Sequence, residues 1–371
     1  MSAETPAELL TEVRGRAGVI TLNRPRAMNA LTHGMVLAMA EALDAWARDP
    51  AVDLVIVTGA GERALCAGGD IVDLYYDGFE GGLGGARMWA DEYALNHAIS
   101  AYPKPYVAVM HGLVLGGGIG ISAHGSHRVV TDSTRAGMPE TAIGFVPDVG
   151  GTWLLSRAPG GIGAHLALTA AHVGPGRAIE AGLADRYVPE ADLPALIAEL
   201  AATGDPAVID RFARPAPDSF EEERAVLDRA YAADTVEEIL AALDAEDAPE
   251  AADAAQRIRR NSPLGLKVTL ESLRRAAGRE LADVLVTEYR VSCRFHLGHE
   301  LREGVRAQVI DKDRQPRWEP PVLEEVDPDE VARYFLPLDH PQIPELDLGR
   351  RPADVGGADA AQSAAAAGSR A

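Results

Sequence analysis

The feature that most constrains this chain is a short apolar segment followed by a glycine-rich turn, and it occurs twice. The segment DLVIVTGAG at 53–61 leads to AGGD at 67–70, and YVAVMHG at 106–112 leads to GGGIG at 116–120. Short apolar runs bounded by glycine are typical of strands buried on both faces. Because helical periodicity resumes after each turn, we predict an α/β fold in which strands alternate with helices.

The remaining patterns predict how the chain is organised. Alternation over residues 8–23, around the turn at 14–16, predicts a β-hairpin, and the glycine-rich stretch at 77–86 predicts a surface loop. Ala/Leu/Glu/Arg patterns over 205–290 predict helices without strands. We therefore predict a core at 1–205, a helical C-terminal region at 206–345, and a low-complexity mobile tail at 346–371.

Charge and cysteine content exclude several classes of protein. The 35 Lys and Arg residues against 56 Asp and Glu residues give a net charge of −21, which disfavours general binding to nucleic acids or anionic membranes. The two cysteines cannot form a disulfide framework, and no Cys/His set has zinc spacing, so we expect no metal. The N-terminal residues lack a basic stretch followed by an apolar run, which predicts a cytoplasmic protein.

Both glycine-rich turns could bind an anion. Adjacent glycines between a strand and a helix expose backbone N–H groups that can hold an oxyanion or a phosphate, although such a turn can also be purely structural. The second turn also matches the dinucleotide pattern G-x-G-x-x-A at Gly118, Gly120 and Ala123. A dinucleotide site would need an acidic residue at the end of the next strand, and neither Asp132 nor Glu140 fits cleanly.

Two carboxyl groups follow in the segment MPETAIGFVPDVGG, at 138–151. Glu140 has the apolar neighbours Met138, Ile143 and Phe145, and loss of hydration there would raise its pKa toward the range of a general base. Asp148 follows eight residues later. The alternative is that Glu140 is a loop carboxylate paired with a cation such as Arg135.

Taken together, these segments resemble the enoyl-CoA hydratase/isomerase (crotonase) superfamily. The resemblance lies in NRPRAMNAL, ALCAGGDI, HGLVLGGGIGIS, PETAIGFVPDVGG and AIEAGLADRYVP, in that order. It is closest to the 3-hydroxyisobutyryl-CoA hydrolase branch, because CAGGDI, DEYALN, TEYRVSCRF and ELREGVRAQVIDKDRQPRW extend it to about residue 340. The resemblance implies a crotonase-like spiral of ββα units followed by a helical C-terminal region, and a homo-oligomer.

The resemblance also implies site residues. The N–H groups of Gly69 and Gly117 would form an oxyanion hole for a thioester carbonyl. Hydratases of this superfamily use two glutamates; Glu140 matches one, but Gly120 stands at the position of the other. This departure counts against plain hydration. The further residues expected to bind substrate are Glu92, Gly68, Ala67, Arg26 and Met28.

The predicted reaction is hydrolysis of a short branched 3-hydroxyacyl-CoA thioester, 3-hydroxyisobutyryl-CoA in valine catabolism. Glu140 would either attack the thioester or activate water, and both possibilities remain open. Asp148 would orient the 3-hydroxyl or the water, and Glu92 would bind the hydroxyl end. Coenzyme A is part of the substrate, and no other cofactor is implied.

Other assignments are open at this stage. Arg24, Arg26 and Arg63 are candidates for the CoA phosphates, the alternative being solvated surface arginines. The alternative functions are a hydratase or isomerase acting on another acyl-CoA, and a CoA-binding subunit without activity.

Overall fold

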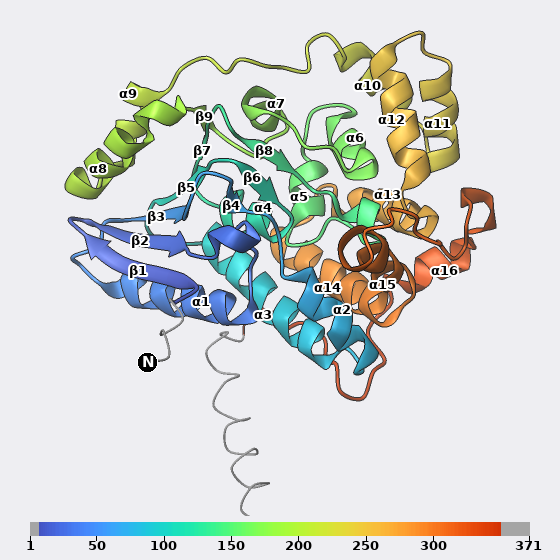
Figure 1. Cartoon of the computed structure of the whole chain (residues 1–371), viewed down its shortest axis with the longest axis horizontal. Helices are drawn as coiled ribbons and strands as arrows, with labels where there is room; N and C mark the ends of the chain where they lie inside the picture. Colours follow the sequence, from blue (N-terminus) through green and yellow to red (C-terminus); the bar gives the residue numbers. More distant parts are fainter. Residues whose placement is uncertain (1–6, 350–371) are drawn as a thin grey trace, which may run out of the picture.

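The computed structural model describes residues 7–349 and contains two β-sheets (Figure 1). In the larger sheet the strand order is β1-β2-β3-β5-β7-β9; only β1 and β2 are antiparallel. The smaller sheet is parallel, with the order β4-β6-β8. The strands are β1 (Leu9–Arg14), β2 (Ala17–Leu22), β3 (Leu54–Gly59), β4 (Ala64–Cys66), β5 (Tyr106–Met110), β6 (Leu113–Leu115), β7 (His127–Val130), β8 (Arg135–Gly137) and β9 (Arg186–Tyr187).

Successive repeats place one strand in each sheet before a helix begins. β3 joins the larger sheet, β4 joins the smaller sheet, and α2 (Ile71–Phe79) follows; β5, β6 and α4 (Gly117–Ser122) repeat this order. Because equivalent parallel strands end at the same edge, the turns after β4 and β6 are neighbours. The predicted α/β spiral of ββα units is confirmed.

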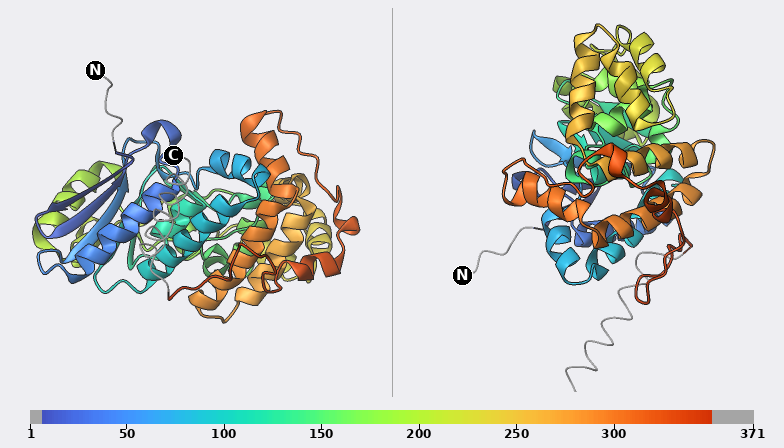
Figure 2. Two further views of the ribbon diagram at one scale, coloured as in Figure 1. Left: turned by 90° about the horizontal axis from the view of Figure 1, so that it is seen from below. Right: turned by 90° about the vertical axis from the view of Figure 1, so that its right-hand side faces the viewer.

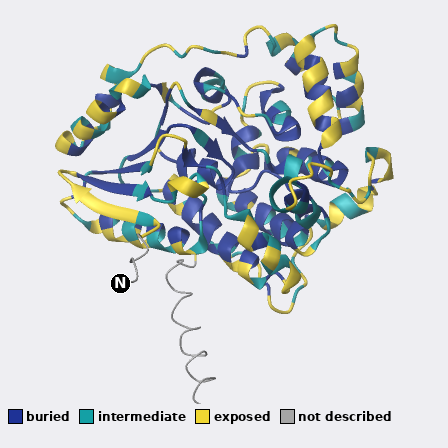
Figure 3. Cartoon of the chain, in the orientation of Figure 1, coloured by how far each residue is buried: buried dark blue, intermediate teal, exposed yellow. Residues whose placement is uncertain are grey.

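The larger sheet is covered on both faces. Ile20, Val55 and Val57 face the main core, whereas their neighbours Val19 and Ile56 pack in a second cluster with α8 (Leu193–Thr203). This alternation is the two-residue period of a strand. Figure 3 shows the buried centre formed by the inner strands and α4, with β1 exposed at the edge.

The predicted hairpin at 8–23 is confirmed as β1 and β2, but the predicted loop at 77–86 is wrong. Most of this stretch is helical: α2 ends at Phe79, and α3 (Leu83–Ser100) begins after a short break. The glycines permit close packing. A Cβ on Gly85 would lie 2.5 Å from Nε2 of His296, and one on Gly84 would lie 2.6 Å from Oδ1 of Asp77.

The remaining helices cover the sheets and form the C-terminal part of the described chain, where no strand follows β9. Two views show α14 beside α3, and the residues of these helices are in contact (Figure 2). The helices of four or more residues not yet given are α1 (His33–Arg48), α5 (Gly151–Leu155), α6 (Ile162–Thr169), α7 (Pro175–Glu180), α9 (Ile209–Phe212), α10 (Arg224–Ala230), α11 (Val236–Asp244), α12 (Pro249–Arg260), α13 (Pro263–Ala276), α14 (Leu281–Leu297), α15 (Glu300–Val305) and α16 (Pro328–Arg333), with the 3₁₀ turn η2 (Glu140–Ile143) and the π-helical turn η5 (Arg306–Ile310).

The predicted boundary at 205/206 and the tail at 346–371 stay predictions. Residues up to Ile209 still pack with α8 against the larger sheet, and Leu346 and Leu348 contact the core. The rest of the tail, from residue 350, lies outside the described residues. Within residues 7–349, no helix has the length and apolar character needed to cross a membrane.

Candidate active site

A cavity of about 250 Å³ lies where the two glycine-rich turns meet the C-terminal helices. Its wall combines α2, α3, the turn between β6 and α4, the segment containing η2, and the α15–η5 region. Seven of the residues predicted from the sequence line it together: Ala67, Gly68, Gly69, Glu92, Gly117, Glu140 and Asp148.

The two glycine-rich turns bring their backbone N–H groups side by side. A Cβ on Gly117 would lie 3.4 Å from the nitrogen of Gly69 and 2.7 Å from Oε1 of Glu92. Gly117 is the first residue of α4, so its N–H has no partner within the helix. Within the described chain, neither the Gly69 nor the Gly117 N–H donates to a loop or turn carbonyl. Two free donors lining a cavity can bind one oxyanion.

Glu140 points at this pair of turns. A Cβ on Gly116 would lie 2.7 Å from Oε1 of Glu140, so a side chain there would displace the carboxyl group. Glu140 is buried, and its Oε2 has no hydrogen-bond partner among the described residues. Burial, followed by the nearby charge of Asp148, raises the pKa of Glu140 well above its ordinary value. The alternative pairing with Arg135 is wrong, because that guanidinium donates to the carbonyls of Asp132 and Thr134.

Asp148 and Glu92 complete a buried acidic cluster. Burial raises the pKa of Asp148 to about 7, although the hydrogen bond from Tyr93 opposes this rise. Burial and the charge of Asp148 raise the pKa of Glu92 to about 8. Carboxyl groups with such pKa values can exchange protons near neutral pH, as general acid–base catalysis requires.

The structure explains why Gly120 replaces the second glutamate of the hydratases. A Cβ at Gly120 would lie 2.7 Å from Cβ of Val149 and 2.9 Å from Nδ2 of Asn96, both inside the protein. A larger side chain would therefore require the turn after Asp148 to move. The backbone around Gly120 is built without room for a catalytic group at this position.

Two predicted substrate-binding residues do not line the cavity. Arg26 is exposed on the 3₁₀ turn Pro25–Ala27, and Met28 follows it with a left-handed backbone. Met28 is nevertheless adjacent to the site, because its carbonyl accepts the N–H of Ala67. Contacts of Arg26 and Met28 with substrate stay predictions, and they require a part of the substrate that extends beyond the cavity.

The arginines proposed to bind the CoA phosphates differ in their exposure to solvent and in the contacts that they already make. Arg24 forms ion pairs with Asp70 and Glu8, and it donates to the carbonyl of Ala30. Arg63 is exposed, as Arg26 is. Arg24 therefore has a structural role at the start of α2, whereas the two exposed arginines remain candidates.

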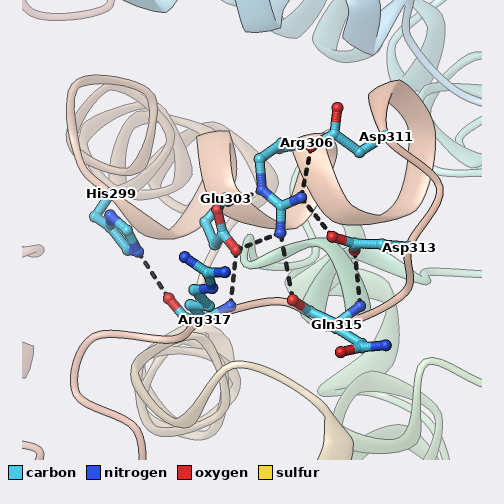
Figure 4. A network of polar contacts seen from close by, with 7 residues as sticks. All are labelled: His299, Glu303, Arg306, Asp311, Asp313, Gln315 and Arg317. Carbon is cyan, nitrogen blue, oxygen red and sulfur yellow. Dashed lines mark hydrogen bonds and ion pairs between the residues drawn. The ribbon is translucent and has the colours of Figure 1, made fainter.

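One wall of the cavity comes from the C-terminal region, where the sequence motifs singled out no site residue. Gln308, in η5, lines the cavity. The segment around it is fixed by Arg306, which pairs with Glu303 at 2.8 Å and with Asp311 and Asp313 at 2.7 Å (Figure 4). Asp311 and Asp313 thus share one guanidinium with Glu303.

The same segment presents cations to solvent. Lys312 and Arg314 are exposed and have left-handed backbones, with φ of 57° each. They follow Gln308 by four and six residues along the chain. Within residues 7–349, no group of three or more His, Cys, Asp or Glu side chains is placed to hold a metal ion.

Comparison with known proteins agrees with this arrangement. Residues 17–335 match the model of the enoyl-CoA hydratase/isomerase family. The chain is 39% identical to 3-hydroxyisobutyryl-CoA hydrolase, mitochondrial, of Danio rerio, covering 91% of this chain and 92% of that protein. It is 38% identical to the protein of the same name from Homo sapiens, covering 91% of each.

Two solved structures are also similar over most of their length. A carnitinyl-CoA dehydratase from Mycobacterium thermoresistibile is 50% identical, with a TM-score of 0.89, covering 92% of this chain and 99% of that one. An enoyl-CoA hydratase from Rhodobacter sphaeroides is 45% identical, with a TM-score of 0.85, covering 92% of this chain and 100% of that one. The chain belongs to the enoyl-CoA hydratase/isomerase family.

Proposed function

We propose that the protein hydrolyses 3-hydroxyisobutyryl-CoA to 3-hydroxyisobutyrate and CoA, a step of valine catabolism. The observation that carries this proposal is the convergence of the Gly69 and Gly117 N–H groups and Glu140 on one cavity, with glycine instead of a second glutamate at position 120. The similarity to curated 3-hydroxyisobutyryl-CoA hydrolases over about nine-tenths of the chain supports the same activity.

In the proposed mechanism the thioester carbonyl accepts the N–H groups of Gly69 and Gly117. The carboxylate of Glu140 then attacks the carbonyl carbon or takes a proton from an attacking water. The C–S bond breaks as a C–O bond forms, and the thiolate of CoA leaves. If Glu140 attacks, water hydrolyses the resulting mixed anhydride and restores the carboxylate.

The other two carboxyl groups bind the acyl part. Asp148 orients the 3-hydroxyl or the water, and Glu92, beside Gly117, bonds the hydroxyl end of the acyl group. The aromatic rings of Trp89 and Phe145 stack at 5.6 Å in the cavity wall and offer an apolar surface to a branched methyl group.

Lys312 and Arg314 supply the cations for the CoA phosphates in this proposal, together with Arg26 or Arg63. Phosphate groups are bound through charge-assisted hydrogen bonds from Lys and Arg. The net charge of −21 makes such local cations necessary for an anionic substrate.

The second candidate is hydration or dehydration of another acyl-CoA, which the names of the two similar solved structures favour. That reaction would need an acid–base partner for Glu140 other than Gly120. Asp148, close enough to raise the pKa of Glu140, is the group available.

One assay separates the two functions. The protein is incubated with 3-hydroxyisobutyryl-CoA and, separately, with crotonyl-CoA, while free thiol and enoyl absorbance are recorded. We expect thiol release from the first substrate and no loss of enoyl absorbance from the second. Loss of enoyl absorbance without thiol release would establish the hydratase instead, and silence in both would leave a CoA-binding protein without activity.

A further inference from the structure

Asp148 reaches the cavity from a turn with an unusual backbone. Val149, the next residue, has φ of 52°, and Gly150 has φ of 77°. Left-handed backbone is common for glycine but rare for β-branched residues, in which Cβ crowds the carbonyl oxygen. Such a conformation persists only where the surrounding structure enforces it, and this happens most often at functional sites.

The backbone of this turn is held by two groups. His124, which lies just after the end of α4, contacts the carbonyl oxygen of Val149 through its Nε2 atom at 2.8 Å. Glu288, in the middle of α14, accepts the N–H of Gly150 at 2.6 Å and the N–H of Thr152 at 3.0 Å. Glu288 is 2% exposed, so these contacts are made without competing water.

The side chain of Asp148 is held by a second chain of contacts. The hydroxyl of Tyr93 donates to Oδ2 of Asp148 at 2.7 Å, and Ser292 lies 2.7 Å from the same hydroxyl. Because Tyr93 gives its only proton to the carboxylate, the hydroxyl of Ser292 must donate to Tyr93. Tyr93 and Ser292 are both fully buried.

We propose that Tyr93, Ser292 and Glu288 are positioning residues, which fix the carboxylate of Asp148 toward the acyl group and the attacking water. This inference rests on the proposed function, in which Asp148 orients those groups. None of these three side chains is part of the substrate cavity wall, so they act on the substrate through Asp148. Two of them belong to α14, which gives the helical C-terminal region a part in catalysis.

The groups that face Asp148 determine what happens when this support is removed. They are Glu92 and Tyr93 from α3, Glu140 from η2 and Glu288 from α14. Glu288 itself faces Arg275, Arg279, Asp283 and Arg290 across a second cavity. Of the side chains around Asp148, Tyr93 alone donates a hydrogen bond to its carboxylate among the described residues. Its loss therefore disfavours the ionised form of Asp148.

The test compares two buried tyrosines that are in contact. Tyr93→Phe removes the donor to Asp148, whereas Tyr289→Phe removes the hydroxyl of its neighbour in α14, which packs edge-to-face on Tyr93 at 6.3 Å. We expect Tyr93→Phe to lower kcat for thiol release about tenfold or more, to leave KM within about threefold, and to shift the rising limb of the pH profile to higher pH. Tyr289→Phe should do none of these.

A second pair covers the case in which Tyr93→Phe does not fold. Ser292→Ala removes the donor to Tyr93, and Ser272→Ala removes another buried mid-helix hydroxyl, which donates to the carbonyl of Val268. We expect a smaller fall in kcat and the same direction of pH shift for Ser292→Ala alone. Equal behaviour of the members of each pair, or an effect on KM or thermal stability alone, would overturn the proposal.

A measurement without turnover separates this proposal from the proposed function. The carboxyl stretch of protonated Asp148 is identified in infrared spectra by its loss in Asp148→Asn and is then titrated with pH. Its midpoint should rise in Tyr93→Phe and stay in Tyr289→Phe, even if the wild-type protein hydrolyses no thioester. An unchanged midpoint in Tyr93→Phe would show that Tyr93 does not support the carboxylate.

Discussion

At the residue scale, the site depends on where side chains are absent as much as on the carboxyl groups. Gly116 and Gly117 leave room for the oxygens of Glu140 and Glu92, each of which would lie 2.7 Å from an added Cβ. Among residues 7–349, one oxygen of Glu140 has no hydrogen-bond partner, so its carboxyl group is available to the substrate. An unpaired buried carboxyl group is costly for folding, which is the usual sign of a group retained for chemistry.

Replacing Glu140 tests its chemical role directly. Glu140→Gln keeps the shape of the side chain but removes both the nucleophile and the base, so we expect thiol release to fall by at least about 10³-fold. Binding of the CoA thioester, measured by calorimetry, should remain near the wild-type value. Glu62→Gln, at an exposed position, is the control. Wild-type turnover in Glu140→Gln would remove this residue from the mechanism.

Adding one carbon tests the oxyanion hole. Gly117→Ala places a methyl group 3.4 Å from the nitrogen of Gly69 and 2.7 Å from Oε1 of Glu92, in the space intended for the thioester oxygen. We expect kcat/KM for thiol release to fall by about 10²–10³-fold with folding retained. Gly34→Ala is the control, because its Cβ would meet nothing closer than 3.8 Å. Equal kinetics of Gly117→Ala and Gly34→Ala would show that the thioester carbonyl does not bind at Gly117.

At the element scale, the C-terminal helices complete a site that the ββα repeats begin. The turns after β4 and β6 supply the N–H donors, while η5 contributes Gln308 to the cavity wall. The π-helical turn η5 is held by the ionic contacts of Arg306, and π-helical turns are common at functional sites. The segment that follows η5 carries the exposed cations proposed for the CoA phosphates.

The proposed role of Lys312 and Arg314 can be tested with a substrate that lacks the nucleotide part of CoA. Lys312→Ala/Arg314→Ala should raise KM for the CoA thioester about tenfold and leave kcat unchanged, because the lost contacts are the same in the ground and transition states. The same acyl group on pantetheine lacks the nucleotide, so wild type and variant should hydrolyse it equally. Arg186→Ala/Arg211→Ala removes the same charge from surface ion pairs and serves as the control. An equal loss with both substrates would contradict the assignment.

At the scale of the whole molecule, the buried carboxyl groups of the site lower the stability of the protein, and the rest of the fold must offset this cost. Burial raises the pKa values of Glu92 and Glu288 to about 8 and that of Asp148 to about 7. Between the ordinary pKa of a carboxyl group and these values, the folded state holds protons that the unfolded state has released. Stability should therefore fall as pH rises through this range.

Removing one of these groups should flatten the pH dependence. Glu92 has its ordinary pKa near 4.5 when unfolded and about 8 when folded, so its contribution is present below about pH 4.5 and lost as pH rises toward 8. Glu92→Gln should gain at least about 1 kcal/mol of unfolding free energy relative to wild type between pH 5 and pH 8. Urea unfolding at both pH values measures it, with exposed Glu325→Gln as the control. A parallel change in both variants would show that Glu92 ionises normally.

The oligomeric state is also a property of the whole molecule. The homo-oligomer implied by the family resemblance and the cytoplasmic location expected from the sequence both stay predictions. The curated relatives from Danio rerio and Homo sapiens are named as mitochondrial, which describes those proteins.

The sequence by itself determined an α/β core in which strands alternate with helices, the two glycine-rich turns, and the carboxyl groups of Glu140 and Asp148. These features are local: strand periodicity, turn glycines and an acidic residue among apolar neighbours are written within a few positions of one another. Local glycine content was nevertheless misleading at 77–86, where the glycines allow helices to pack closely on Asp77 and His296.

Only the tertiary structure decided what surrounds those groups. Glu288 is 138 positions from Gly150, and Ser292 is 199 positions from Tyr93, yet these contacts hold Asp148 in place. Which face of α14 meets α3 depends on how side chains interlock across the whole core, and no short window of sequence contains that information. The motifs therefore predicted the carboxyl groups and the glycine-rich turns, whereas the contacts that position Asp148 exist only because distant helices pack together in the folded protein.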